Sequence, residues 1–239
     1  MEKILNHPLI GDIKIVKGGI GRSIRLSVHI KRGVRVSVPR FVSYDDALRY
    51  VESKIEWIIE ALEKQRKRSE KFTVAIGDGY EILTLKGVIR FEKRTDEQNG
   101  ENKKIKVTLK GVERTISYGD ETSREELKEA VIKILRKEAK EYLPNRLECL
   151  SRQYGFVYNK VYLKNNTSNW GSCSSRNNIN LNIHLMRLPY ELCDYIILHE
   201  LSHLKYRNHG EKFHKLVNEL CGGREREITK ELRKFRPEI

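Results

Sequence analysis

The segment His199-Glu200-Leu201-Ser202-His203 constrains the fold of this chain more than any other feature. Two histidines four positions apart lie on one face of an α-helix, so both imidazoles can reach one metal ion. The flanking residues are apolar, as expected of a helix buried in a core; they are Tyr195, Ile196, Ile197, Leu198, Leu201 and Leu204. Buried histidines and a buried carboxylate are costly unless they are satisfied, and a divalent cation satisfies them. The segment therefore predicts a buried metal-binding helix.

A third ligand must come from outside this pair, because a catalytic zinc ion usually has three protein ligands and one position open to water. His209 follows six residues after His203, where the chain must turn at Asn208-His209-Gly210. A chain that bends there can return the imidazole to the metal, so we predict that His209 is the third ligand. Three other residues remain as alternatives; they are His214, Glu219 and Glu225.

The residues around this motif predict hydrolytic chemistry. Zinc would lower the pKa of a water to about 7, and Glu200 would accept the water proton and pass it to the leaving amine. Tyr206, in the turn after the helix, is a candidate hydrogen-bond donor to the developing oxyanion, with simple packing as the alternative. The spacing to His209 equals that of metzincins. However, Tyr206 replaces their glycine, and the only methionines, Met1 and Met186, cannot form their methionine turn.

Charge and cysteine content narrow the choice of partner and compartment. The net charge of +14 favours polyanions, but the basic residues are scattered among acidic ones, so DNA association is compatible with the sequence and not established by it. The four cysteines are widely spaced and form no CxxC pair, so we expect neither a disulfide framework nor a thiolate zinc cluster. No signal-like run or membrane-length apolar stretch is present, so we expect a soluble cytoplasmic protein without membrane contact. The oligomeric state is left open.

The amino-terminal part predicts β structure with one long helix. A helix capped by Ser43 or Asp45 is expected to run to about residue 68. The polar segment 96–104 predicts an exposed hairpin loop. The predicted strands are 13–16, 24–30, 34–38, 72–76, 80–85, 88–91 and 105–109.

The pattern shifts near residue 118, where we place a domain boundary. Residues 1–118 form the β-rich amino-terminal region and residues 119–239 the catalytic domain, with no internal repeat. Ser123-x-x-Glu126 is a capping box that opens a long helix, which Pro144 is expected to break or kink.

The metal motif is predicted to lie in a small mixed structure. Strands are expected over 156–163 and 179–185, with His184 on the polar side of the second strand, where it lines the cleft or is a plain strand residue. Pro189 is expected to begin the motif helix, and a further helix spans 211–220. The fold class is therefore α+β, with a zincin-like metallopeptidase core in which the HExxH helix packs on a small sheet.

A series of motifs in this chain resembles the YgjP-like family of metal-dependent hydrolases, which is related to SprT-like and WLM-type metallopeptidases. The resemblance is strongest over residues 160–220 and covers most of the chain. The motifs are Trp170-Gly171-Ser172-Cys173-Ser174, Asn177-Asn178-Ile179-Asn180-Leu181-Asn182, Leu198 to Lys205, Asn208-His209 and Phe213.

The resemblance implies that His199, His203 and His209 are zinc ligands and that Glu200 is the general base. It also implies a zincin-type α+β core with β structure before it. Two positions depart from the family pattern, since Asn169 stands where arginine is common and His214 stands where an aromatic residue is usual.

The segment before the motif helix has a physical interpretation of its own. Trp170 is expected to be a buried anchor and Gly171 a turn glycine. The strand from Asn178 to Leu185 is a candidate edge for holding an extended peptide by backbone pairing, or it only packs against the motif helix.

Three functions follow from these observations. The leading hypothesis is a zinc metallopeptidase acting on protein or peptide substrates, including DNA-associated proteins. The second is a metal-dependent hydrolase of a nucleic acid or a small amide. The third is a nucleic-acid-binding accessory protein with a structural zinc site, which would need a fourth protein ligand such as His214 and would have no use for Glu200.

Overall fold

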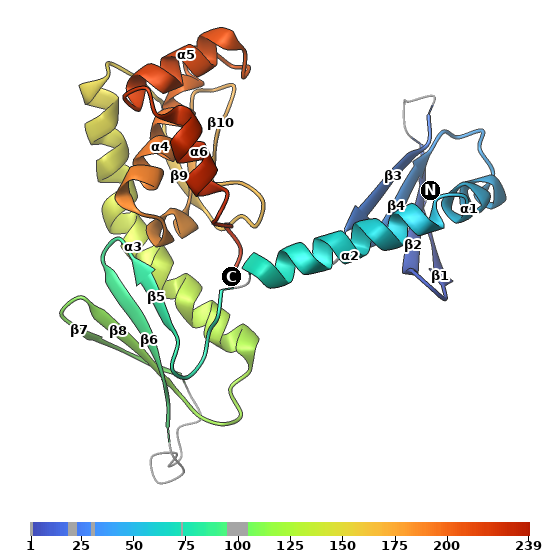
Figure 1. Ribbon diagram of the computed structural model, residues 1–239, viewed down its shortest axis with the longest axis horizontal. Helices are drawn as coiled ribbons and strands as arrows, with labels where there is room; N and C mark the ends of the chain where they lie inside the picture. The colour runs from blue at the N-terminus through green and yellow to red at the C-terminus, as the bar shows by residue number, and fades with distance from the viewer. Residues whose placement is uncertain (1, 19–22, 30–31, 73, 95–104) are drawn as a thin grey trace. The chain divides into compact units, whose positions relative to one another are not determined.

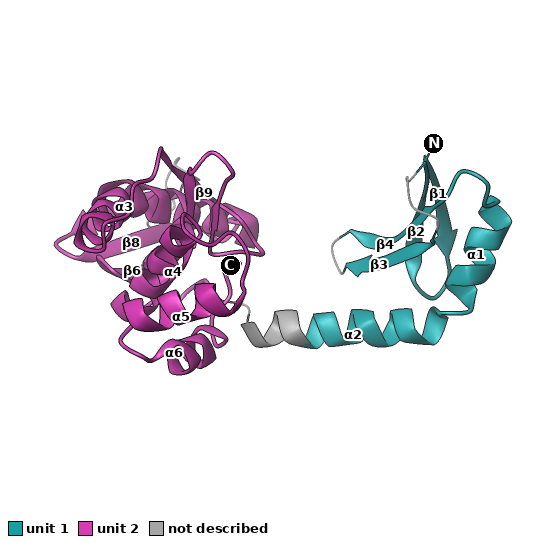
Figure 2. Ribbon diagram, turned by 90° about the horizontal axis from the view of Figure 1, so that it is seen from above, with its two compact units in different colours: residues 1–73 teal, residues 74–239 magenta. Residues whose placement is uncertain are grey.

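The computed structural model describes residues 2–18, 23–29, 32–72, 74–94 and 105–239, which form two compact units (Figures 1 and 2). The first unit is Met1–Thr73 and the second is Val74–Ile239. Each unit has a hydrophobic core of its own. The predicted loop over 96–104 lies outside the described residues.

The first unit contains a four-stranded sheet with the order β1-β2-β4-β3. Its strands are Glu2–His7 (β1), Gly11–Lys17 (β2), Arg25–His29 (β3) and Gly33–Val38 (β4). The inner strands β2 and β4 are parallel, and both outer pairs are antiparallel. The predicted alternation is confirmed where Ile13, Ile15 and Val36 enter the core. β1 was not predicted, because its apolar residues Ile4 and Leu5 are adjacent and do not alternate.

Two helices follow this sheet where the sequence predicts one; they are Tyr44–Glu52 (α1) and Ile55–Phe72 (α2). α1 begins after Ser43, as predicted, and the Ser43 hydroxyl accepts a hydrogen bond from the backbone N–H of Asp46 at 3.0 Å. It ends at Ser53, whose hydroxyl donates to the carbonyl of Tyr50 at 2.8 Å. Such local bonds compete with helical ones, which explains the interruption.

The second unit opens with another four-stranded sheet, in the order β5-β6-β8-β7. Its strands are Glu81–Thr84 (β5), Gly87–Lys93 (β6), Lys106–Lys110 (β7) and Glu113–Tyr118 (β8). Again the inner pair is parallel and the outer pairs are antiparallel. The two units thus share a strand order that no sequence repeat reveals. The strand expected over 72–76 is absent, because Phe72 ends α2 and residues 74–76 are irregular.

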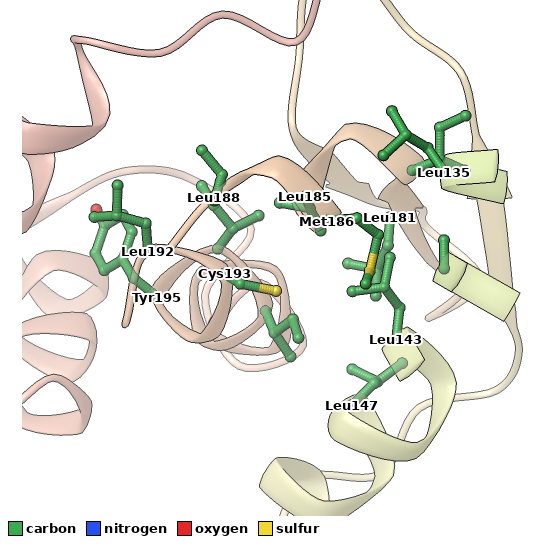
Figure 3. Close-up of a cluster of buried hydrophobic side chains, with 14 of the residues drawn as sticks. Leu135, Leu143, Leu147, Leu181, Leu185, Met186, Leu188, Leu192, Cys193 and Tyr195 are labelled. Carbon is green, nitrogen blue, oxygen red and sulfur yellow. The ribbon is translucent and has the colours of Figure 1, made fainter. Parts of the chain in front are cut away.

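A long helix, Arg124–Gln153 (α3), follows the second sheet. The predicted capping box is confirmed, since the side chains of Ser123 and Glu126 each accept a bond from the backbone N–H of the other residue. The predicted break at Pro144 is wrong, because α3 continues through it. Proline in a helix costs about 3 kcal/mol. Leu143 and Leu147 are fully buried on either side (Figure 3), and their burial offsets that cost.

The sheet β5–β8 shares one hydrophobic core with the helices after it. Ile89 and Ile116 from the sheet belong to the same buried cluster as α3 and the motif helix. The backbone N–H of Leu85 donates to the carbonyl of Met186 at 2.8 Å, and the Tyr190 hydroxyl donates to the carbonyl of Leu85 at 2.7 Å. The boundary expected near residue 118 therefore falls inside the second unit, and the compact units divide at 73/74 instead.

A three-stranded sheet lies beside the motif helix, with the order β10-β11-β9. Its strands are Val161–Lys164 (β9), Gly171–Cys173 (β10) and Ile179–Asn182 (β11). β11 is central in this sheet, so the candidate edge expected at 178–185 is occupied on both sides, and β10 is an edge strand instead. Trp170, expected as a buried anchor, is half-buried and packs against the hydrophobic core of the second unit.

The second half of the predicted strand 179–185 is a 3₁₀ helix, Ile183–Arg187 (η2). The side-chain oxygen of Asn182 caps it by accepting a bond from the backbone N–H of His184 at 3.1 Å. His184 is buried, and its Nε2 lies 2.8 Å from Oδ1 of Asn165. His184 is therefore part of the interior packing under the sheet.

The motif helix Tyr190–Ser202 (α4) begins after Pro189, as predicted. It contacts α3, β10 and β11 and the two last helices, Glu211–Leu220 (α5) and Glu225–Leu232 (α6). Residues on all its sides are buried, among them Leu192, Cys193 and Tyr195 (Figure 3). Within the described part of the chain, no helix has both the length and the apolar character needed to cross a membrane.

Candidate metal centre

Three histidines converge at the end of α4. His199 lies in the last turn of the helix, His203 is its C-cap residue, and His209 lies in the segment that leads to α5. One ring nitrogen from each histidine lies within 4.8 Å of the other two. Nε2 of His199 and Nε2 of His209 are 3.1 Å apart. The structure therefore brings together the three residues predicted as metal ligands.

This spacing and donor set fit a zinc ion. Two nitrogens that each lie 2.0–2.1 Å from a tetrahedral zinc ion are about 3.3 Å apart, close to the 3.1 Å between the rings of His199 and His209. Imidazole nitrogens are among the donors that zinc prefers. Among the described residues, no further histidine, cysteine or carboxylate joins the group. Three protein ligands and one open position are the arrangement of catalytic zinc.

Two neighbours hold the imidazoles in place. Nδ1 of His203 lies 3.1 Å from the backbone carbonyl of Tyr206. A carbonyl only accepts, so this nitrogen carries the proton and Nε2 keeps its lone pair for a metal. Phe213 is fully buried, and its ring centroid lies 4.9, 4.6 and 4.7 Å from those of His199, His203 and His209. This single aromatic ring packs against all three candidate ligands.

The protonation states also suit metal binding. Burial, followed by the charges of the neighbouring histidines, lowers the pKa of His199 to about 4. Burial lowers the pKa of His203 as well, although its bond to the Tyr206 carbonyl opposes that shift. Both imidazoles are therefore neutral at pH 7, and a neutral imidazole is the form that binds metals. Burial raises the pKa of the Glu200 carboxyl group to about 8.

The Glu200 side chain packs directly on the backbone of β10. Glu200 is 5% exposed. A Cβ atom added at Gly171 would lie 2.7 Å from Cγ and from Oε1 of Glu200, closer than real contacts allow. Gly171, expected as a turn glycine, is therefore a strand residue whose missing side chain makes room for the carboxyl group.

The histidines and Glu200 line one pocket of about 300 Å³, together with β10. Its lining residues are Gly171, Ser172, Cys173, His199, Glu200, His203, Arg207 and His209. Tyr206, predicted as an oxyanion donor, is not among them, and its side chain is 37% exposed. Arg207 was not predicted, since nothing in the local sequence distinguishes it from the other basic residues of the chain.

The outer edge of β10 offers backbone groups to the pocket side of the sheet. Ser174 donates its backbone N–H to the carbonyl of Asn178 at 2.9 Å, so the backbone N–H and C=O groups of Ser172 and Ser174 point toward β11. In an antiparallel pair, the alternate residues of the edge strand point their backbone N–H and C=O groups away from the neighbouring strand. Gly171 and Cys173 occupy those positions. The carbonyl of Gly171 also accepts a bond from the Asn169 side chain at 2.9 Å.

The alternative third ligands lie outside the histidine group. Nδ1 of His214 lies 2.7 Å from Oε1 of Glu225, so these two residues pair with each other. The ring centroid of His214 is 6.3 Å from that of His209. Glu219 is exposed on α5.

Comparison with known proteins places the chain in a family. The model of the YgjP-like metallopeptidase domain matches residues 22–235, so the chain belongs to the YgjP-like metallopeptidase family, and the resemblance seen in the sequence is confirmed. Among solved structures, the metallopeptidase zymogen of Pyrococcus abyssi abylysin is 24% identical, with a TM-score of 0.32, over 38% of this chain and 96% of that chain. The metallopeptidase zymogen of Methanocaldococcus jannaschii jannalysin is 25% identical, with a TM-score of 0.32, over 37% and 95%. No curated protein matches the chain.

Proposed function

We propose that the chain is a zinc-dependent peptidase with a zincin-type core, in which His199, His203 and His209 bind zinc and Glu200 is the general base. Membership of a metallopeptidase family supports a divalent metal and a protein or peptide substrate. The observation that carries the proposal is the convergence of three imidazole nitrogens in a pocket that also contains a buried carboxyl group.

The chemistry follows from the groups that line the pocket. A zinc ion held by His199, His203 and His209 would supply the Lewis acidity that activates a water and polarises a scissile carbonyl. Among the described residues that line the pocket, Glu200 is the only one with a carboxyl group, so it accepts the water proton and passes it to the leaving amine. Burial raises the pKa of its carboxyl group to about 8 in the metal-free site, and the positive charge of a bound zinc ion would lower that pKa and favour the carboxylate that accepts a proton.

The edge of β10 is the surface on which we propose that an extended substrate lies. A peptide strand can pair with the outward backbone groups of Gly171 and Cys173, with the scissile bond facing the histidines. Tyr206 contributes through its backbone carbonyl, which orients His203. A role for its hydroxyl at the oxyanion stays a prediction.

The test compares the wild type with Glu200→Gln, which preserves the size of the side chain. We expect about one zinc per chain in both proteins, and cleavage of casein that falls by about 10²-fold or more in the variant. Glu219→Gln, on the exposed side of α5, is the matched control and should cleave like the wild type. Zinc binding without cleavage in the wild type would favour a non-peptide substrate, and equal cleavage by Glu200→Gln would contradict the proposal.

DNA-associated proteins are the substrates that the net charge of +14 suggests. If this part of the proposal holds, duplex DNA added at low salt should accelerate cleavage of a DNA-bound protein and leave cleavage of casein unchanged. If duplex DNA does not accelerate this cleavage, the proposal of DNA-associated substrates is wrong, and the proposed peptidase mechanism is unaffected.

A further inference from the structure

We propose that Arg207 is a positioning residue that couples the metal-binding segment to the edge strand β10. Arg207 lies between His203 and His209 in the chain and also lines the pocket. The inference rests on the proposed metal centre, and it is independent of which bond the enzyme cleaves.

The guanidinium group of Arg207 holds the connection between β10 and β11 at three points. Its Nη1 donates to the backbone carbonyl of Ser174 at 2.7 Å and lies 3.4 Å from Sγ of Cys173. Its Nη2 donates to Oδ1 of Asn177. Because these acceptors lie on both sides of one turn, the arginine fixes the end of β10 and the start of the return to β11.

The turn that Arg207 holds has a conformation that benefits from support. Asn177 has φ of 59°, the left-handed region that only glycine and a few polar residues adopt readily. Its backbone N–H donates to the Ser174 carbonyl at 3.0 Å, the same carbonyl that Arg207 binds. Within the described part of the chain, β10 pairs with a strand on one side only, so few backbone bonds resist its local opening.

The other end of the segment depends on the metal. Nδ1 of His203 donates to the Tyr206 carbonyl, directly before Arg207, and His209 follows two residues after Arg207. A metal ion bound to both histidines therefore fixes the segment on either side of the arginine. Ordering of Arg207 lowers the entropic cost of its bonds to Ser174 and Asn177, so metal binding should stabilise β10 as well.

An arginine suits this role better than a lysine. Its planar guanidinium presents nitrogens in a fixed fork and reaches the Ser174 carbonyl with one and Asn177 with another. A lysine has a single ammonium nitrogen and cannot hold both acceptors in this geometry. We therefore expect Arg207→Lys to recover only part of the coupling.

The test measures amide hydrogen exchange of residues 171–178 in the full chain, with and without zinc. In the wild type, zinc should slow exchange of this segment by about fivefold or more, the lower end of typical coupling between sites. Arg207→Gln should lose that protection and, because coupling between two sites is reciprocal, should bind zinc more weakly by no more than about the same factor, with Arg207→Lys intermediate in both. Lys205→Gln is the matched control, because Lys205 is in the same segment but its ammonium lies over the Phe156 ring at 4.9 Å.

Any other result overturns either the coupling or the proposed function. Zinc-dependent protection that persists in Arg207→Gln, or that is absent from the wild type, would overturn the coupling. A loss of zinc affinity in Arg207→Gln that greatly exceeds the loss of protection would show that the arginine acts on the metal site itself, and it would overturn the coupling as well. A wild type that binds zinc and shows protection, but cleaves no peptide, would overturn the proposed function alone.

Discussion

The contact between Gly171 and Glu200 gives the sharpest quantitative prediction. In Gly171→Ala, the new Cβ would lie 2.7 Å from Cγ and Oε1 of Glu200 and 2.9 Å from its Cδ. Ordinary contacts between carbon atoms lie at about 3.5–4.0 Å, so the strand and the carboxyl group must separate by roughly 1 Å. Glu200 is buried, and the new Cβ would meet its side chain from Cγ to the terminal Oε1, so a rotation of the carboxyl group alone does not relieve the contact.

The size of the effect follows from two general magnitudes. Overpacking of a buried site costs about 1–3 kcal/mol, and we expect this loss in the unfolding free energy of the second unit. Misplacement of a catalytic group by about 1 Å lowers activity by about 10²-fold, and we expect this loss in kcat/KM for peptide hydrolysis.

A double-mutant cycle isolates the contact. Alanine at position 200 lacks Cγ, Cδ and Oε1, so Gly171→Ala should destabilise the Glu200→Ala protein by much less than it destabilises the wild type. Chemical denaturation of all four proteins gives the four free energies. Equal destabilisation in both backgrounds would refute the reasoning, because the strain would then come from other atoms.

Three further predictions concern the support of the site. Asn182 donates its side-chain amide to the carbonyls of Asn166 and Asn169, both at 2.8 Å. Asn182→Asp cannot donate these bonds, so denaturation should show a loss of at least about 2 kcal/mol. Burial, followed by the charge of Arg187, lowers the pKa of His184 to about 3, below its value of about 6.5 in an unfolded chain. The contribution of neutral His184 to the unfolding free energy is therefore complete above about pH 6.5 and is lost as the pH falls toward 3. In the metal-free protein, the unfolding free energy should fall by up to about 1.4 kcal/mol per pH unit over this range, and His184→Gln should reduce that slope. Removal of zinc with a chelator should lower the calorimetric midpoint of the second unit by roughly 5–10 °C and leave that of the first unit unchanged.

The grouping of the candidate ligands could be predicted because the information is local. His199 and His203 are one helical turn apart, and Gly210 marks the point at which the chain turns after His209. The apolar residues around them predicted burial of Glu200, and the structure confirms that burial.

The roles of Arg207 and Gly171 could not be predicted, because both depend on contacts between segments that are distant in the sequence. Arg207 is one of 47 basic residues, and its acceptors lie 30 to 34 residues earlier in the chain. Gly171 meets Glu200 only after β10 and α4 have packed together, and no property of the five residues around it indicates that contact.

The errors in the fold have the same origin. The change of pattern near residue 118 is a change from strand to helix inside one core, and a sequence pattern does not distinguish this from a domain boundary. Pro144 disfavours a helix locally, but buried leucines on both sides of it outweigh that preference.

X-ray absorption of the zinc-loaded protein tests the central claim most directly. The account predicts three imidazole nitrogens and one oxygen from water at about 2.0–2.1 Å from the metal, and a loss of one nitrogen in His209→Ala. A sulfur atom at about 2.3 Å, which would place Cys173 on the metal, or a fourth imidazole from His214, would contradict it, because the ion would then have no position open to water.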